Sequence, residues 1–405
     1  MSHFQEKTIA ELIAERAILA IQDGNHGEKH PKSTDYVEEG IHFVMANDLN
    51  SGAVDLKGCS KIPESLASKL RIGFSVEGDV LLTHKGTIGN VAIVGSIAPY
   101  IMLTPQVTYY RTDNAKLSNK YLAYAFREPN FQKRMKSLAQ QSTRPYIGIT
   151  AQRNLKILWT DRETQESITE IISKYDDLIE NNKRRIELLE DSARQLYKEW
   201  FVRFRFPGHE HAKIIDGVPE GWQKKPFSSV ADFLNGFAFK PSHFEEDGLP
   251  IVKIPELKDG VSEKTPRNSG VDVPTSLHLE DGDLLFSWSG TLAVNVWASG
   301  PALLNQHLFK VKSTAELSRS FLLVALREAM PQFMNETTGA TMKHIRRAAL
   351  DKVQVIFPRE HLLSEFEDFV TNCYEQVIYL YKQNISLTQA RDILLPKLMS
   401  GEIAV

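Results

Sequence analysis

The feature that most constrains this chain is an internal repeat with a period of about 200 residues. The segment Gly-Asp-Val-Leu-Leu at 78–82, followed by Gly-Thr-Ile at 86–88, recurs as Gly-Asp-Leu-Leu-Phe at 282–286 and Gly-Thr-Leu at 290–292. Gln106 corresponds in the same way to Gln306. Solenoid repeats are only about 20–50 residues long, so a period of this length indicates a duplicated domain.

Length and composition agree with an ordinary globular protein of two or three domains. A chain of 405 residues is longer than one hydrophobic core usually organises. Its 42% hydrophobic and 24% charged residues exclude a disordered or fibrous protein. No apolar run approaches the roughly 18 residues of a membrane span, and the first residues do not resemble a signal peptide. We therefore expect a cytoplasmic protein with no membrane partner.

The pattern along the chain predicts an α+β fold with two mixed α/β domains. Residues 1–160 alternate short β-rich runs with Gly-containing turns, and residues 207–358 repeat the pattern after a Pro- and Gly-rich linker. Each domain is followed by a helical region, at 161–206 and at 359–405. Cys59 and Cys373 fall at unrelated places in the two halves, so we expect buried thiols and neither a disulfide nor a metal cluster.

Both helical regions carry apolar residues at alternating steps of three and four, which is the heptad spacing of a coiled coil. The first helix is expected from Glu163 to Trp200, and the second from near Leu362 until Pro396 ends it. Such narrow apolar stripes are best buried against each other, as an antiparallel pair. Asn182 and Asn384 either tolerate a helix edge or fix the register. The candidate seam residues are Ile168, Ile172, Tyr175, Ile179, Asn182, Ile186, Leu189, Phe366, Val370, Val377, Leu380, Asn384 and Leu387.

Basic residues gather at equivalent places in the two halves, although the formal net charge is only −3. Between Lys116 and Lys156, nine Lys and Arg residues are opposed by Glu128 alone. The second half offers Lys343, His344, Arg346, Arg347 and Lys352. A single basic run is often only a solvated face, but its recurrence favours contact with nucleic acid.

Two kinds of segment carry residues suited to DNA in each half. The first is a Gly-containing turn, at 84–89 and 287–292, for which a plain hairpin is the alternative interpretation. The second is a polar, basic loop, at 140–146 and 337–344. Their Lys, Arg, Gln, Thr and Ser side chains suit phosphates or base edges. The candidates are Lys85, Thr87, Gln141, Thr143, Arg144, Tyr146, Ser289, Thr291, Thr341, Lys343, His344 and Arg346.

Nearly the whole chain resembles the DNA specificity subunits of type I restriction-modification systems. The similar segments are Gly-Asp-Val-Leu-Leu at 78–82, Gln-Glu-Ser-Ile at 165–168, Leu-Tyr-Lys-Glu-Trp-Phe at 196–201 and Leu-Pro-Lys-Leu-Met-Ser-Gly-Glu-Ile at 395–403. The second helix departs from the family pattern, because it opens with Arg-Glu-His-Leu-Leu at 359–363 and lacks the Glu-Gln pair.

The resemblance implies that each domain recognises one half of an asymmetric, bipartite site in double-stranded DNA. The helices would set the gap between the halves and dock two methyltransferase subunits, and restriction and translocase subunits would complete the complex. S-adenosylmethionine, ATP and Mg are then expected on the partners, with no cofactor on this chain. In agreement, the sequence has neither a phosphate-binding Gly-x-x-x-x-Gly-Lys loop nor an Asn-Pro-Pro-aromatic motif, so we expect no catalysis.

Two other functions were weighed. A metal-dependent nuclease would need carboxylates and a lysine such as Asp247, Glu256 and Lys258, but the repeat places Asp48 and Asn50 opposite Glu256 and Lys258. A coiled-coil scaffold without DNA recognition would explain the helices and the duplication. It would leave the paired basic segments unexplained.

Overall fold

The computed structural model describes residues 4–27, 30–50, 52–97, 99–139, 145–338 and 344–405. It divides into two units, one formed by residues 1–177 and 388–405 and the other by residues 178–387. We call them unit 1 and unit 2. The boundary falls inside both long helices, so each unit contains part of each helix.

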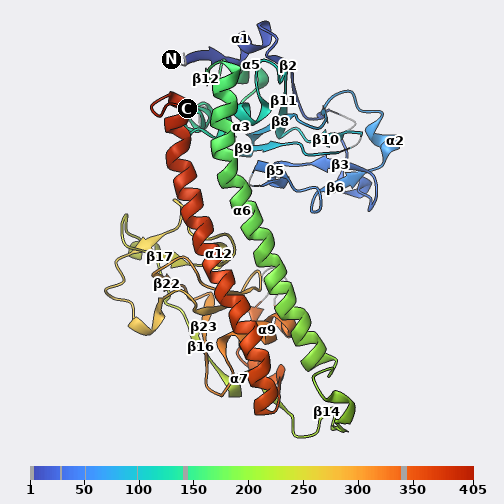
Figure 1. Cartoon of the computed structure of the whole chain (residues 1–405), viewed down its shortest axis with the longest axis vertical. Coiled ribbons are helices and arrows are strands. Elements are labelled where there is room, and N and C mark those ends of the chain that lie inside the picture. Colours follow the sequence, from blue (N-terminus) through green and yellow to red (C-terminus); the bar gives the residue numbers. More distant parts are fainter. Residues whose placement is uncertain (1–3, 28–29, 51, 98, 140–144, 339–343) are drawn as a thin grey trace. The chain divides into compact units, whose positions relative to one another are not determined.

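Unit 1 is built around two sheets (Figure 1). The larger has the order β2-β11-β8-β9-β5-β4, and the smaller has the order β6-β3-β10-β7 with β3 and β10 parallel. The strands of the larger sheet are β2 (Ile18–Asp23), β4 (Leu49–Asn50), β5 (Gly52–Val54), β8 (Val80–Lys85), β9 (Thr87–Ile93) and β11 (Val107–Thr112). Those of the smaller sheet are β3 (Ile41–Val44), β6 (Ser60–Ile62), β7 (Phe74–Ser75) and β10 (Ile101–Leu103).

Helices and one further strand pair complete unit 1. The helices are α1 (Ile9–Ala14), α2 (Glu64–Ala67), α3 (Asn119–Arg127), α4 (Pro129–Ala139) and α5 (Ile149–Arg153). Strand β1 (Gln5–Thr8) pairs antiparallel with β12 (Lys156–Trp159) and thereby joins the two ends of the globular part. The apolar faces of α3 and α4 pack on the larger sheet, where Tyr110, Phe126 and Met135 are completely buried.

Unit 2 repeats this arrangement, except that its larger sheet, in the described part of the chain, has four strands and lacks counterparts of β4 and β5. Its sheets have the orders β16-β23-β20-β21 and β18-β17-β22-β19, with the parallel pair now β17 and β22. The strands are β15 (Gln223–Pro226), β16 (Ala231–Asn235), β17 (Leu249–Val252), β18 (Arg267–Asn268), β19 (His278–Leu279), β20 (Leu284–Ser287), β21 (Val294–Val296), β22 (Ala302–Leu304), β23 (Leu308–Ser313) and β26 (Gln354–Phe357). The closing pair is β15 with β26. The internal repeat inferred from sequence is therefore a repeat of topology.

Unit 2 also contains short helices and two further strand pairs. Its helices are α7 (Phe227–Val230), α8 (Ile254–Asp259), α9 (Arg319–Glu328), α10 (Met330–Asn335) and α11 (Ala349–Lys352). Two further antiparallel strand pairs are found in unit 2 without a counterpart among the described residues of unit 1, β13 (Ile214–Ile215) with β14 (Val218–Pro219) and β24 (Thr337–Thr338) with β25 (His344–Ile345).

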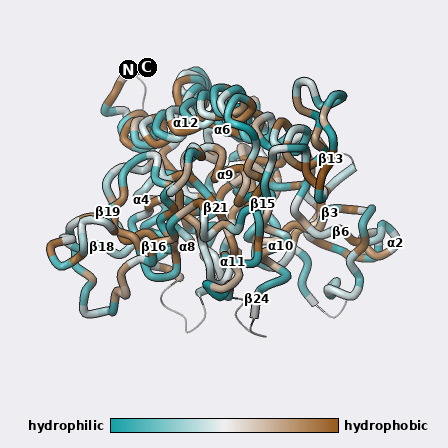
Figure 2. Tube along the Cα trace, turned by 90° about the horizontal axis from the view of Figure 1, so that it is seen from below, coloured by the Kyte–Doolittle hydropathy of each residue, from teal (hydrophilic) through white to brown (hydrophobic). Residues whose placement is uncertain are grey.

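The two long helices lie side by side and antiparallel within each unit (Figure 1). Helix α6 spans Arg162–Tyr197 and continues as a π-helical turn over Lys198–Val202, and α12 spans Glu360–Ser400. In unit 1 the start of α6 shares a core with the end of α12, and in unit 2 the end of α6 packs against the start of α12. Both helices carry hydrophilic and hydrophobic residues (Figure 2). The predicted antiparallel coiled coil is confirmed.

The expectation that Pro396 ends the second helix is wrong, because α12 continues to Ser400. A proline inside a helix removes one backbone hydrogen bond and crowds the preceding turn. Here the loss falls in the last turns, where Leu395, Leu398 and Met399 are 4%, 2% and 1% exposed in the core of unit 1. Their burial offsets the missing hydrogen bond, since a fully buried apolar side chain contributes about 1.5–3 kcal/mol.

Cys59 and Cys373 are both buried free thiols, as predicted. No helix in the described part of the chain is long and apolar enough to cross a membrane.

Candidate nucleic-acid interface

The first predicted Gly-containing turn is the tip of the β8–β9 hairpin. Lys85 and Thr87 face each other across Gly86, whose φ of +76° is a left-handed conformation that glycine adopts without strain. The side chains of Lys85 and Thr87 are exposed. The turn therefore presents an ammonium and a hydroxyl group to solvent, on the scaffold of a buried strand.

The segment after the first polar loop lies against this hairpin. Tyr146 forms an isolated antiparallel bridge with Lys85, and Ile147 N donates to His84 O at 3.0 Å. The Lys85 ammonium lies 6.0 Å from the centroid of the Tyr146 ring, which is within the range of a weak cation–π interaction. Tyr146 remains 47% exposed. The fold thus places together two segments that the sequence separates by about sixty residues.

The buried side chain of His84 contacts the segment that contains Tyr146 and Ile147. Its side chain is 1% exposed, its Nδ1 is 3.0 Å from Ile147 O, and its ring lies 5.5 Å from that of Tyr146. Burial lowers the pKa of His84, and Asp23, 3.7 Å from Nε2, only partly opposes this effect. The neutral imidazole with its proton on Nδ1 then donates to Ile147 O.

Unit 2 forms the same junction with different side chains. Ser289 forms a bridge with His344, and Ile345 N donates to Trp288 O at 2.9 Å. The rings of Trp288 and His344 lie 5.8 Å apart, and Gly290 has φ of +66°. Trp288 thus takes the position of His84. The two predicted segments meet in both units, so their proximity is a property of the repeated fold.

The structure changes the interpretation of one candidate. Ser289 is only 2% exposed, and its hydroxyl lies 3.0 Å from His307 Nδ1. We therefore assign Ser289 to positioning His307 and not to a direct contact. Thr291 and Arg346 are exposed, and His344 is half-buried. The other candidates, Gln141, Thr143, Arg144, Thr341 and Lys343, lie outside the described residues.

Part of the predicted basic stretch is engaged within unit 1. Arg134 and Lys156 both pair with Glu6, at 3.0 and 3.2 Å, and these contacts lower the pKa of Glu6. Arg127 pairs with Asp176 at 3.3 Å. These three residues tie β1, α3 and α4 to neighbouring elements, so internal ion pairing accounts for some of the local excess of positive charge. Lys120, Lys133, Lys136 and Arg153 are exposed.

The seam candidates occupy two levels of burial. The nine that are buried are Ile168, Ile172, Ile179, Asn182, Ile186, Phe366, Val370, Val377 and Leu380. The four that are half-buried are Tyr175, Leu189, Asn384 and Leu387. Within unit 2, Asn182 Nδ2 donates to Asn384 Oδ1 and to Gln383 Oε1, each at 2.9 Å. The two polar seam residues thus meet in one layer and are joined by one hydrogen bond, in which Asn182 is the donor.

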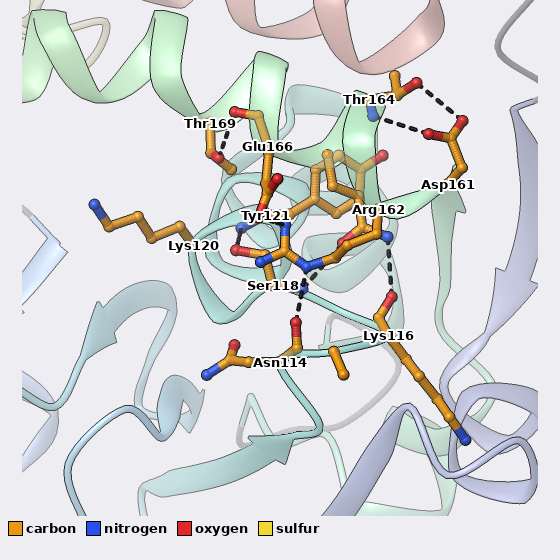
Figure 3. A network of polar contacts seen from close by, with 12 residues as sticks. Asn114, Lys116, Ser118, Lys120, Tyr121, Asp161, Arg162, Thr164, Glu166 and Thr169 are labelled. Atoms are coloured by element: carbon orange, nitrogen blue, oxygen red, sulfur yellow. Dashed lines mark hydrogen bonds and ion pairs between the residues drawn. The ribbon is translucent and has the colours of Figure 1, made fainter.

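Each long helix is also bonded to the N-terminus of an earlier helix in its unit. In unit 1, Gln165 is completely buried and its carboxamide accepts from Ser118 N, at the start of α3, at 3.0 Å. The same amide donates to Lys116 O and Thr160 O, at 3.2 and 2.8 Å. Figure 3 shows this region, in which Asp161 caps the first turn of α6 through Thr164. In unit 2, Glu367 accepts from Ser318 N at the start of α9.

Sequence reasoning missed Trp288 and His307 and did not give His84 its positioning role. A signal was present for Trp288, because it occupies the position in the repeat that corresponds to His84. Its aromatic ring was not recognised as a support for a distant loop. Among the described residues, no three His, Cys, Asp or Glu side chains are grouped so that they could hold a metal ion.

The family of the type I restriction modification DNA specificity domain matches residues 18–191 and again residues 219–361. The chain belongs to this family. The two matches fall on the two halves of the repeat, so each half carries one copy of the specificity domain.

Similar proteins of this family cover most of the chain. The type I restriction enzyme MjaIX specificity subunit of Methanocaldococcus jannaschii is 26% identical over 86% of this chain and 83% of its own length. The HindI specificity subunit of Haemophilus influenzae is 24% identical, over 65% of this chain and 72% of its own length. A crystal structure of a type I S subunit from M. genitalium has a TM-score of 0.55 at 16% identity and covers 98% of this chain and 96% of that one. This last match supports the fold.

Proposed function

We propose that this chain is the sequence-specific DNA-recognition subunit of a type I restriction-modification complex. The observation that carries the proposal is the duplicated specificity domain, with an exposed hairpin and an adjoining segment brought together in the same way in both copies. The chain itself is not a catalyst. Its partners are double-stranded DNA and the other subunits of the complex.

In finer detail, residues 1–160 and 207–358 form two recognition domains, each binding one half of an asymmetric, bipartite site. Lys85, Thr87 and Tyr146 face the first half-site, and Thr291, His344 and Arg346 face the second. The helical regions 161–206 and 359–405 set the gap and dock two methyltransferase subunits. Because hairpin chemistry differs between the units, with Lys85 opposite Ser289, the two half-sites differ as well. S-adenosylmethionine, ATP and Mg belong to the partner subunits.

The first test is coexpression of this chain with its methyltransferase subunit in a host that lacks adenine methylation. Methylated adenines are then mapped by single-molecule sequencing. The expected result is one split, asymmetric motif that disappears when this chain is omitted. If a soluble complex with an intact methyltransferase leaves the DNA unmodified, the chain acts as a scaffold and the proposal is wrong.

A charge reversal tests the position of the interface. Lys85→Glu should weaken binding of the assembled complex to its duplex and reduce the salt slope of the binding constant by about 1, as expected when one phosphate contact is lost. Lys69→Glu is the matched control, because Lys69 is also exposed but lies between α2 and β7, away from the hairpin. Equal effects of the two variants would place the interface elsewhere.

A further inference from the structure

Gln106 and Gln306 occupy equivalent positions beside the two hairpins. Gln106 precedes β11, and its carbonyl oxygen accepts from His84 N at 2.9 Å. The carbonyl oxygen of Gln306 accepts from Trp288 Nε1 at 3.0 Å, and Gln306 N donates to Phe237 O at 3.0 Å. In each unit, the backbone carbonyl group of the glutamine accepts a hydrogen bond from the residue at the base of the exposed turn, from its backbone in unit 1 and from its side chain in unit 2.

The carboxamides of these two glutamines are not fully used in hydrogen bonds within the protein. Among the described residues, the Gln106 carboxamide makes no hydrogen bond, and its Nε2 lies 3.8 Å from the place where a Cβ on Gly86 would be. Because Gly86 has no side chain, it does not cover the carboxamide of Gln106. The Gln306 carboxamide oxygen is buried and has no hydrogen-bond partner. In contrast, the carboxamides of Gln132, Gln152 and Gln165 all bond to the protein.

An unpaired carboxamide at both positions calls for an external partner. For the buried Gln306 oxygen the missing hydrogen bond costs about 1–3 kcal/mol, so internal stability does not explain this glutamine. The Gln106 side chain is half-buried, and its carboxamide is left for a partner outside the protein. The repeat retains it although neighbouring residues differ, with Pro105 opposite Asn305 and Val107 opposite His307. A residue shared by two domains that bind different sequences should contact a chemical group common to both half-sites.

We propose that Gln106 and Gln306 each recognise one adenine, on either strand, in their own half-site. This inference rests on the proposed function and names residues that determine specificity within it. A carboxamide matches adenine in the major groove, because its oxygen accepts from the N6 amino group while its nitrogen donates to N7. An uncharged amide is less suited to phosphate, for which the neighbouring Lys85 and Arg346 provide positive charge. For Gln306, this contact requires the side chain to turn its oxygen outward from its buried position, where the oxygen has no internal partner.

The test uses the assembled complex and duplexes that carry the motif found for the wild-type chain. Each adenine is replaced in turn by 7-deazaadenine, which lacks the N7 acceptor, and binding is measured by equilibrium competition. One adenine in each half-site should lose affinity on this replacement, by less than the roughly 5-fold to 150-fold expected for a complete bidentate contact, because the N6 amino group remains. Gln106→Ala should cause a loss at least as large and abolish the sensitivity to 7-deazaadenine in the first half-site only. Gln306→Ala should do the same in the second.

The controls separate this inference from the function on which it rests. Gln223→Ala removes an exposed glutamine of β15 and should change neither affinity nor the response to 7-deazaadenine. Thermal unfolding of Gln106→Ala should match that of the wild type, since no internal bond is lost. If the losses from Gln106→Ala and from 7-deazaadenine add, or if Gln106→Ala binds normally, the inference is overturned while the proposed function stands. Absence of any motif for the wild type would overturn both.

Discussion

Gln165→Leu should detach the first turn of α6 from the start of α3 without changing the heptad seam. Gln165 is completely buried, and its carboxamide makes three hydrogen bonds, with Ser118 N, Lys116 O and Thr160 O. Leucine has a similar volume and keeps the helix propensity. The change therefore removes the polar contacts and leaves the packing nearly intact.

The magnitude follows from the three partner groups. Each buried group that loses its hydrogen bond costs about 1–3 kcal/mol, unless it moves to reach water. Lys116 precedes α3 in an exposed turn, so its carbonyl group can be hydrated, whereas Ser118 and Thr160 are buried. The two buried groups together cost about 2–6 kcal/mol. Burial of the leucine side chain offsets part of this, so we expect a net loss of about 2–4 kcal/mol in the free energy of opening at this junction.

Hydrogen exchange measured by mass spectrometry is the appropriate assay, because it reports local opening in a protein of two units. Amides of α3 should exchange about a hundredfold faster in Gln165→Leu, while those of α9 keep their rates. The matched control is Glu367→Gln, which keeps an acceptor for Ser318 N in unit 2. If α3 in Gln165→Leu exchanges within about threefold of the wild type, the three bonds do not hold this junction.

Two further results are expected. Burial lowers the pKa of His84, so its contribution to stability is present above the unfolded value near 6.5 and is lost as pH falls below it. The melting temperature should therefore fall more steeply from pH 7.5 to 5.5 in the wild type than in His84→Gln, and parallel slopes would contradict this. Replacing both Asn182 and Asn384 by leucine should stabilise unit 2 or leave it unchanged, whereas Asn384→Leu alone should cost about 1 kcal/mol, because the buried Asn182 amide loses one of its two acceptors and keeps Gln383. Urea denaturation of the double-mutant cycle checks this, and additive single effects would show that the two amides do not interact.

Local patterns predicted much of the fold. The heptad spacing of Ile168, Ile172 and Ile179 placed these residues on a buried helix face, where the structure has them. The Gly-containing turns at Gly86 and Gly290 have the left-handed φ angles that made glycine informative. The candidate site was predicted less completely, because exposure depends on distant neighbours. Ser289, polar and next to a glycine, is nonetheless buried, and it forms a bridge with the distant His344.

The sequence by itself determined the duplication, the two helical seams and the residue types at the hairpin tips, because periodicity and backbone preference act over a few residues. Only the tertiary structure decided which segments meet. In the tertiary structure Tyr146 contacts Lys85, and β1 pairs with β12. Helix α12 continues past Pro396 because apolar residues of its last turns are buried in the core of unit 1. These outcomes depend on long-range strand pairing and on shared burial, which local patterns do not record. The positions of Gln106 and Gln306 beside their hairpins likewise depend on the tertiary structure.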